Sequence, residues 1–374
     1  MTSSLAETGI EASIIIIGWR VVEELRECLD SIKASVNPPS HEVIVVLNGT
    51  SDATAAIAHG HPAVTRVIDR AANIGFGAAG NLAASVASGT NLIFLNDDAR
   101  VDKDWLRTIV DASKASNENR AIASVLLNDD GTVQEAGSRI LSHGGTHQWG
   151  AGLTVAQAQE NGMAARRPID YGSAAALLVK RATFEKLGGF DAMYEPAYFE
   201  DVDLQMRLRE SGVEIWLEPE ALVTHHSGLS TTNDHWFKKF AADRSGTRFI
   251  ERWAGVLATS PGDDAPVDEL CVVPLSERPA SQHPLIDPAV DDSLHRALEM
   301  AADYEKWMAH QLDQLEQYRA ELVNDPTAPT RSELLDRLHE LKGRIEDIEN
   351  RSVFGLLKMK AGSKLNELRN RRNA

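Results

Sequence analysis

The chain has 374 residues, of which 43% are hydrophobic and 25% charged, and its formal net charge is -17 at pH 7. This length predicts a catalytic-sized domain plus an additional segment. The negative charge excludes a general nucleic-acid-binding protein, which needs a basic face. Cys28 and Cys271 give neither a disulfide framework nor metal-ligand spacing, and neither a signal peptide nor a bilayer-spanning apolar run is present. We therefore expect a cytoplasmic protein without a nucleic-acid partner.

The first half of the sequence alternates apolar runs with helical patterns. A helix ending before Pro38 follows the first run, and a Gly-rich stretch, NIGFGAAGNLAASVASG (residues 73–89), predicts a loop that opens another helix. Such alternation predicts an α/β fold with a mostly parallel sheet and helices on both faces. The predicted strands are 13–18, 42–47, 64–69 and 91–96.

Beyond about residue 120 the pattern is irregular. GSAAALLVKR (172–181) predicts a strand followed by a short helix, and VEIWLEP and ALVTHH predict two short strands. A helix over 235–253 is expected to close this body. The resulting prediction is a domain over residues 1–255.

The C-terminal part of the sequence changes character. Its composition predicts a Pro-rich linker over 256–292, a helical hairpin or short coiled coil over 293–350, and a basic amphipathic tail over 351–374. A heptad seam favours either homodimerisation or packing within the chain, and the tail favours either a membrane surface or a solvated basic segment. The seam residues are Leu334, Leu338, Leu341, Ile345 and Ile348.

Acidic residues follow the strand predicted at 91–96. Asp97 and Asp98 come directly after it, where an open α/β sheet binds its ligands. Buried acids there indicate either a hard cation or the start of a turn. His225 and His226 end a later apolar run and favour either metal coordination or a structural role.

The stretch YFEDVDLQMRLRESG combines aromatic and acidic residues at the start of a predicted helix. Its acids are explained either by helix capping or by catalysis. Tyr198 and Phe199 are placed either to desolvate an acid and stack on a sugar or to join the core. Asp203 is interpreted as a helix-entry residue or an ion-pair partner of Arg207.

Seven stretches, taken in order, resemble the inverting family 2 glycosyltransferases of the GT-A fold, particularly bacterial rhamnosyltransferases. The resemblance runs from about Ser13 to Trp253. The matching stretches are EVIVVLNGTSDAT, NIGFGAAGN, FLNDDARV, DGTVQEAG, GSAAALLVKRATFEKLGGFD, YFEDVDLQMRLRESG and VTHHSG.

The resemblance implies roles for individual residues. Asp201 corresponds to the general base, with Glu200 beside it. Asp98 corresponds to the last acid of the family's metal element, Asn96 stands at its first position as a neutral ligand, and His225 completes the site, with His226 as the fallback. The implied substrate-binding residues are Asn48, Arg70, Asn73, Gly75, Asn81, Asp97 and Gly172.

Leu47 departs from the family pattern, because the family usually has an acid there that helps to read the nucleotide base. Asn48, Asp69 or Arg70 would then compensate.

The implied reaction transfers a sugar, rhamnose first and galactofuranose second, from a nucleoside-diphosphate donor to a glycan or lipid-linked acceptor. Its cofactor is a divalent cation, magnesium or manganese. The expected location is the cytoplasm or the inner face of the cell membrane, in cell-surface polysaccharide synthesis. The alternatives are a nucleotidyltransferase and a catalytically impaired sugar-nucleotide-binding protein.

Overall fold

The computed structural model describes residues 9–115, 120–226, 235–262, 299–311 and 313–314. Two compact units divide the chain, Met1–Ile286 and Asp287–Ala374. The helices of the first unit are α1 (Glu23–Lys33), α2 (Asp52–Gly60), α3 (Phe76–Ala84), α4 (Trp105–Lys114), α5 (Val155–Glu160), α6 (Arg181–Lys186), η1 (Ala192–Tyr194), α7 (Glu200–Glu210) and α8 (His235–Leu257). Its strands are β1 (Ala12–Gly18), β2 (His41–Asn48), β3 (Arg66–Arg70), β4 (Asn91–Asn96), β5 (Ala99–Val101), β6 (Arg120–Leu127), β7 (Val133–Glu135), β8 (Ser138–Ile140), β9 (Thr146–Gln148), β10 (Arg167–Ile169), β11 (Ala176–Lys180) and β12 (Glu214–His225).

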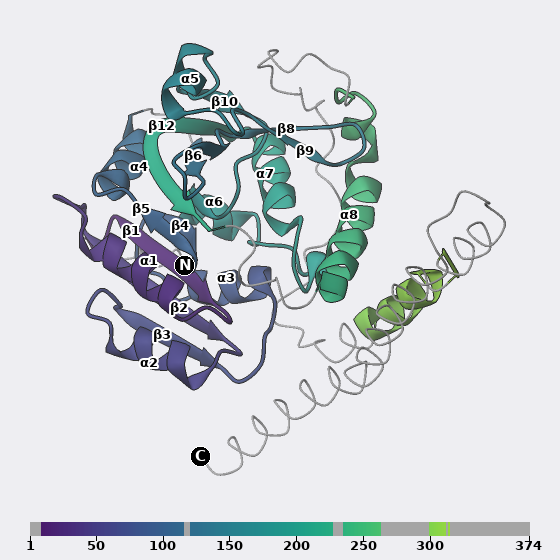
Figure 1. Ribbon diagram of the computed structural model, residues 1–374, viewed down its shortest axis with the longest axis horizontal. Coiled ribbons are helices and arrows are strands. Elements are labelled where there is room, and N and C mark those ends of the chain that lie inside the picture. The colour runs from purple at the N-terminus through teal and green to yellow at the C-terminus, as the bar shows by residue number, and fades with distance from the viewer. Residues whose placement is uncertain (1–8, 116–119, 227–234, 263–298, 312, 315–374) are drawn as a thin grey trace, which may run out of the picture. The chain divides into compact units, whose positions relative to one another are not determined.

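A ten-stranded mixed sheet is the centre of the first unit (Figure 1). Its main path runs β10-β12-β6-β11-β4-β1-β2-β3, with β5 beside β12 and β7 beside β6. Strands β1 to β4 are mutually parallel, and β6 is parallel to β12. Strand β11 lies between β4 and β6 and runs antiparallel to both. The predicted α/β fold with a mostly parallel sheet and flanking helices is confirmed.

The helices cover both faces of this sheet because alternate residues of its buried strands face opposite sides. In β1, Ile14 and Ile16 pack with residues of α1, α2 and α4, whereas Ile15 and Ile17 pack with residues of α3, α6 and α7. Both sides are apolar cores, which explains why the sequence reads as continuous hydrophobic runs. A core on each face holds the strand ends in fixed relative positions.

Three features differ from the sequence prediction. VEIWLEP and ALVTHH form one strand, β12, interrupted by a shift in register between Glu218 and Leu222. The region after residue 120 contains a fully paired inner strand, β6, and helix α2 was not predicted. Two of these differences have local causes. A bulge separates the two apolar runs of β12, and α2 is short and rich in alanine, so its sequence has no clear apolar stripe.

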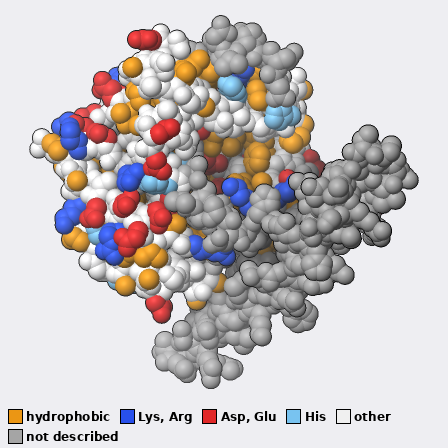
Figure 2. All heavy atoms as spheres, in the orientation of Figure 1, with side chains coloured by type: hydrophobic (Ala, Val, Ile, Leu, Met, Phe, Trp, Pro, Cys, Tyr) orange, Lys and Arg blue, Asp and Glu red, His pale blue; other side chains and the backbone are white. Residues whose placement is uncertain are grey.

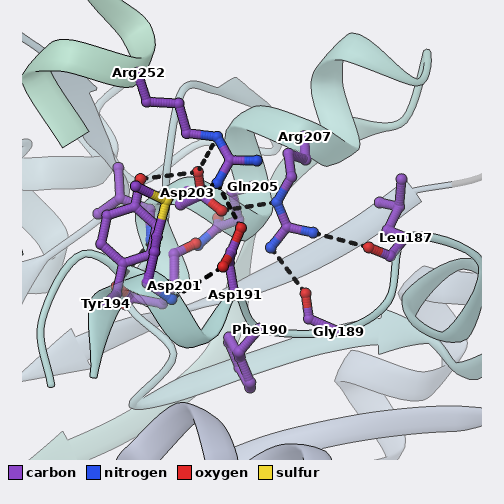
Figure 3. A network of polar contacts seen from close by, with 12 residues as sticks. Leu187, Gly189, Phe190, Asp191, Tyr194, Asp201, Asp203, Gln205, Arg207 and Arg252 are labelled. Carbon is purple, nitrogen blue, oxygen red and sulfur yellow. Dashed lines mark hydrogen bonds and ion pairs between the residues drawn. The ribbon is translucent and has the colours of Figure 1, made fainter. Parts of the chain in front are cut away.

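A polar network joins α7, α8 and the segment around η1 (Figure 3). Asp203 is fully buried, and its Oδ2 accepts a hydrogen bond from Nε of Arg207 at 2.7 Å. Its Oδ1 accepts from the hydroxyl of Tyr194 at 3.1 Å and from the indole N–H of Trp253 at 3.0 Å. Arg252 lies 3.3 Å from the same oxygen. The predicted pairing of Asp203 with Arg207 is confirmed.

Most of the predicted C-terminal organisation lies outside the described residues. Residues 263–298 and 315–374 contain most of the predicted linker, the heptad seam and the whole basic tail, while residues 299–311 are helical. The domain boundaries, the homodimer and the tail therefore stay predictions. Among the described residues, no helix is both long and apolar enough to cross a membrane.

Candidate active site

The carboxyl end of β4 delivers two acids into a turn. Asp97 and Asp98 form this turn, which leads into β5, and both side chains are buried. Oδ2 of Asp97 accepts a hydrogen bond from the backbone N–H of Trp19 at 2.7 Å, so this carboxylate holds the end of β1. Burial, with a smaller effect of Asp98, raises the pKa of Asp97. Asp97 therefore fits the interpretation that these acids begin a turn. Asp98 makes no comparable side-chain hydrogen bond through its Oδ1.

Asp98 faces the end of β12. Its Oδ1 is buried and has no hydrogen-bond partner, and Nε2 of His225 lies 3.3 Å from it. Nδ2 of Asn96 lies 3.0 Å from the same ring nitrogen. His226 points elsewhere and pairs with Asp129 at 2.7 Å. The structure thus brings together the three residues predicted as metal ligands and separates the fallback histidine from them.

These three residues offer a restricted ligand set. Within the described part of the chain, no cluster of three or more His, Cys, Asp or Glu side chains could hold a metal ion. Asp98 and His225 supply one carboxylate oxygen and one imidazole nitrogen, and the Oδ1 atom of Asn96 is a further oxygen. Mg²⁺ sites commonly take one or two carboxylates and complete their shell with substrate phosphates and water. The orphaned carboxylate oxygen fits this pattern, so these residues are compatible with a cation that binds together with a diphosphate.

Asp201 lies in the first turn of α7 and faces the segment before β11. Its Oδ2 accepts from the hydroxyl of Tyr171 at 2.8 Å and from the backbone N–H of Ala174 at 3.1 Å. Its Oδ1 accepts from the N–H of Val202 at 2.9 Å. Burial raises the pKa of Asp201, and these three hydrogen bonds oppose the rise. The carboxylate is thus fixed in orientation and is more basic than an exposed aspartate.

Glu200 is the more deeply buried member of the acid pair. Its side chain is 7% exposed, and its Oε2 has no hydrogen-bond partner. Burial, followed by the charge of Asp201, raises the pKa of Glu200 well above its usual range. Adjacent carboxylates disfavour double ionisation, and the larger rise in pKa falls on Glu200. Helix capping explains part of the pair, because Oδ1 of Asp201 accepts from the first-turn N–H of Val202, whereas Oε2 of Glu200 has no such contact.

Glu135 is a buried acid to which no role was assigned from the sequence. Its Oε1 accepts from the backbone N–H of Ser173 at 2.8 Å. Burial raises the pKa of Glu135 to about 7; the charge of Asp201 adds to this rise, and His225 opposes it when its ring is protonated. Glu135 therefore lies within electrostatic reach of both the candidate base and the candidate metal ligand. The DGTVQEAG stretch was the available signal, but only a fold brings it beside residues 173, 201 and 225.

The aromatic residues before α7 have strained backbones. Tyr198 and Phe199 have φ angles of 73° and 67°, which L-residues seldom adopt and which cluster at functional sites. The ring of Phe199 lies 5.2 Å from that of Phe249 in α8, between centroids. Phe199 is partly buried and packs against the core, which supports the core alternative of the prediction.

The Gly-rich loop before α3 is tied to the end of β2. Asn48 donates from Nδ2 to Oδ1 of Asn73 at 3.0 Å and to the carbonyl of Gly75 at 3.3 Å. Its Oδ1 accepts from the N–H of Ile74 at 2.8 Å. Gly75 has φ of 88°, and a Cβ there would lie 2.6 Å from the carbonyl of Pro196. These residues cluster as predicted, but the polar atoms of Asn48 bind the loop itself.

Two other predicted substrate-binding residues are also engaged with the protein. Both polar atoms of the Asn81 amide bind the backbone of Phe190, with Nδ2 donating to its carbonyl at 2.8 Å and Oδ1 accepting from its N–H at 2.9 Å. Gln205 clamps Gly172 in the same way, at 2.9 Å to its N–H and 2.7 Å to its carbonyl. Asn81 and Gly172 are thus held by contacts within the protein, and their role in substrate binding stays a prediction.

The carboxyl end of β3 presents a guanidinium to the same edge of the sheet. Arg70 is half-buried, and its side chain makes no hydrogen bond or ion pair with the described residues. Asp69 is exposed and pairs with His59 at 3.1 Å. Leu47 is 2% exposed and packs in the core with α1. Its apolar side chain therefore cannot hydrogen-bond a nucleotide base as the acid usual at this position would. Of the proposed compensating residues, Arg70 is the one with an uncommitted side chain.

The space-filling view shows a hollow near the middle of one face, with hydrophobic and acidic side chains around it (Figure 2). Comparisons with known proteins show what the chain is similar to. Residues 13–170 match the model of Glycosyl transferase family 2. The N-acetylglucosaminyl-diphospho-decaprenol L-rhamnosyltransferase of Mycobacterium tuberculosis is 28% identical over 243 residues, covering 59% of this chain and 78% of the relative. The O-antigen biosynthesis protein RfbC of Myxococcus xanthus is 30% identical over 228 residues, covering 56% of this chain but 17% of that protein.

A solved structure shares the fold. The crystal structure of GalNAc-T7 with UDP, GalNAc and Mn2+ has a TM-score of 0.53 at 14% identity, covering 68% of this chain and half (50%) of that one. The first unit therefore carries the GT-A fold of glycosyltransferases. Over residues 13–170, which are less than half of the chain, it is similar to glycosyl transferase family 2.

Proposed function

We propose that this glycosyltransferase inverts the anomeric centre of a nucleoside-diphosphate sugar, with Asp201 as general base. The observation that carries the proposal is the held carboxylate of Asp201. Two hydrogen bonds, from Tyr171 and Ala174, orient its Oδ2, while burial raises its pKa. A base that is fixed in place and partly desolvated removes a hydroxyl proton more effectively than a mobile surface acid.

The chemistry follows from where charge develops. The acceptor hydroxyl attacks the anomeric carbon, its oxygen forms the new glycosidic bond, and its proton passes to Asp201. The bond to the diphosphate breaks, and the leaving group keeps the electron pair. Glu200, holding its own proton, leaves Asp201 as the group that accepts the new one.

A divalent cation, magnesium or manganese, is the proposed cofactor. Asp98 and His225 would hold it, with Oδ1 of Asn96 as a third, weaker ligand. When bound, the cation stabilises negative charge on the departing diphosphate. The orphaned Oδ1 of Asp98 beside Nε2 of His225 supports this assignment.

Relatives guide the choice of substrate. The name of the mycobacterial relative specifies transfer of L-rhamnose to a diphospho-decaprenol-linked N-acetylglucosamine. We propose a deoxythymidine- or uridine-diphosphate sugar as donor, with rhamnose first and galactofuranose second. The proposed acceptor is a hydroxyl of a glycan or lipid-linked glycan used in cell-surface polysaccharide. Arg70 is the proposed partner of the donor, because its guanidinium is uncommitted.

A second candidate function is a catalytically impaired sugar-nucleotide-binding protein. Buried Leu47 favours it, since the base-reading acid is missing, and so does the amide of Asn96 at a metal-ligand position. A nucleotidyltransferase, by contrast, would need neither the acid pair of α7 nor His225.

Membrane association, location at the cytoplasmic leaflet and homodimerisation stay predictions. Co-sedimentation with anionic vesicles, comparing the full chain with one ending at residue 350, tests the role of the basic tail. Equal binding by both would remove the tail from the proposal.

The proposed function is tested with a panel of nucleotide sugars. Thermal shift with nucleoside diphosphates, with and without Mg²⁺ or Mn²⁺, reports the preferred base and the effect of the metal. Release of nucleoside diphosphate in the presence of acceptor then reports transfer. Binding without turnover by any donor–acceptor pair would favour the impaired binder, and absence of binding would contradict both candidates.

A further inference from the structure

Gln134 lies beside His225 although 91 residues separate them in the sequence. Nδ1 of His225 lies 2.8 Å from Oε1 of Gln134. Nε2 of Gln134 donates to the main-chain carbonyl of His225 at 3.1 Å and to Oδ1 of Asn128 at 3.2 Å. One amide group therefore grips both the ring and the backbone of a single residue.

The fold places this amide by a local irregularity. Leu126 and Leu127 of β6 pair with Glu135 and Val133 of β7, so Gln134 is an extra residue in the ladder. Such β-bulges redirect side chains and are frequent beside active sites. Strand β12, which ends in His225, also pairs with β6. The bulge thus brings Gln134 to the end of β12.

The hydrogen-bond partners determine which way the amide points. A main-chain carbonyl can only accept, so the group of Gln134 that faces the carbonyl of His225 must be its NH₂. The oxygen Oε1 is then the atom that faces Nδ1. Because an amide oxygen can only accept, Nδ1 of His225 must carry a proton. The main-chain carbonyl of His225 thus determines both the orientation of the Gln134 amide and the tautomer of the His225 ring.

The consequence lies at the other ring nitrogen. In a neutral imidazole with a proton on Nδ1, Nε2 holds the lone pair. That nitrogen lies 3.3 Å from the orphaned Oδ1 of Asp98, and Nδ2 of Asn96 approaches it as a donor at 3.0 Å. We infer that Gln134 is a positioning residue, which locks His225 in the Nδ1-protonated tautomer and thereby aims the Nε2 lone pair at the cation site beside Asp98. The inference rests on the proposed metal role of His225.

The same contacts explain why glutamine suits this position. A glutamate could accept from Nδ1, but its second oxygen would face the carbonyl of His225 and the amide oxygen of Asn128. Only a side chain that accepts at one atom and donates at the other satisfies both sides. Residues that hydrogen-bond a metal-ligating histidine typically change metal affinity by about 10- to 100-fold when they are removed.

Two readouts on the full chain test the inference. Long-range ¹⁵N–¹H NMR at alkaline pH, with the His225 signals assigned by their loss in His225→Ala, should show the proton on Nδ1 and mixed tautomers in Gln134→Met. Binding of MnCl₂ in the presence of UDP, followed by the EPR signal of free Mn²⁺, should weaken about 10- to 100-fold in Gln134→Met. Gln148→Met, on exposed β9, is the matched control and should bind Mn²⁺ like the wild type.

The outcomes are distinguishable. A wild-type proton on Nε2, or wild-type Mn²⁺ affinity in Gln134→Met while His225→Ala loses binding, would overturn the inference and leave the proposed metal site intact. Wild-type Mn²⁺ affinity in His225→Ala would overturn both. If Gln134→Met fails to fold, Asn128→Ala tests the same chain of contacts, because it removes one of the two acceptors that orient the NH₂ group of Gln134 without touching His225. Its Mn²⁺ binding should weaken, and unchanged binding would contradict the inference.

Discussion

Two acids of α7, two residues apart, have opposite environments. Asp203 receives hydrogen bonds from Arg207, Tyr194 and Trp253, and Arg252 lies beside it (Figure 3). Asp201 has no cationic partner among these contacts and is held only by a hydroxyl and two backbone N–H groups. Its neighbour Glu200 has a buried oxygen with no hydrogen-bond partner.

The contrast separates structural acids from acids available for chemistry. A buried carboxylate that is fully paired with cations has a structural role, because its oxygens are not available to accept a proton from a substrate. A buried carboxylate without cationic compensation costs stability, which proteins tolerate mainly at functional sites. Asp98, with its orphaned oxygen, belongs with Glu200 in the second group, and Asp201, which is partly exposed, likewise has no cationic partner.

The largest expected effect is on stability. Asp203→Ala leaves the guanidinium groups of Arg207 and Arg252 buried without their shared carboxylate, and breaking such a pair costs about 3–5 kcal/mol. Urea unfolding should show this loss in the free energy of unfolding, and Asp201→Asn is the matched control on the same helix. Wild-type stability with abolished transfer in Asp203→Ala would reverse the comparison.

Replacing the candidate base should instead affect the rate. Asn at position 201 can still accept from Tyr171 and Ala174 but cannot take a proton, so transfer should fall by about 10²- to 10⁴-fold. Calorimetry should find donor binding and thermal stability close to the wild type. Retained activity would return the acid pair to a helix-end role.

The sequence predicted the first half of the fold well, because β1 to β4 are buried on both faces and read as unbroken apolar runs. The prediction of two short strands at 213–226 was wrong, because a bulge in the single strand β12 separates its two apolar runs. Asp98 and His225 were candidate metal ligands from their places after apolar runs, but only the family resemblance joined them to each other and to Asn96, because 127 residues separate Asp98 from His225. Gln134 and Glu135 were missed, since their roles depend on a bulge and on contacts across 91 and 38 residues.

Glu135 provides a pH test of the uncompensated acids. Its pKa is raised from 4.5 to about 7, mainly by burial, so the folded chain binds this proton more tightly than the unfolded chain. The resulting stability is complete below pH 4.5 and is lost as the pH rises through about 7, a change of about 3 kcal/mol. Glu135→Gln keeps an acceptor for the N–H of Ser173 and removes this loss.

Urea unfolding of both chains at about pH 4 and pH 8 measures the difference. The free energy of unfolding of Glu135→Gln should gain about 3 kcal/mol on the wild type across this range. A constant difference at the two pH values would show that burial does not perturb Glu135.

The smallest effect is expected on nucleotide binding. Asp98→Asn should weaken binding of UDP in Mn²⁺ by about tenfold, or 1.4 kcal/mol, and leave binding in chelator unchanged. Asp129→Asn is a matched control, because this exposed acid pairs with His226 and Arg100 outside the site. Equal losses with and without metal would contradict the assignment of Asp98 as a ligand.

The central claim is that uncompensated acids at the carboxyl edge of the sheet are reserved for the donor and its cation. Anomalous diffraction from crystals grown with Mn²⁺ and UDP tests it most directly. The account predicts one Mn²⁺ peak at about 2.0–2.3 Å from Oδ1 of Asp98 and Nε2 of His225, with the diphosphate completing the shell. A Mn²⁺–diphosphate complex bound away from both residues, or coordinated by Asp203, would contradict it.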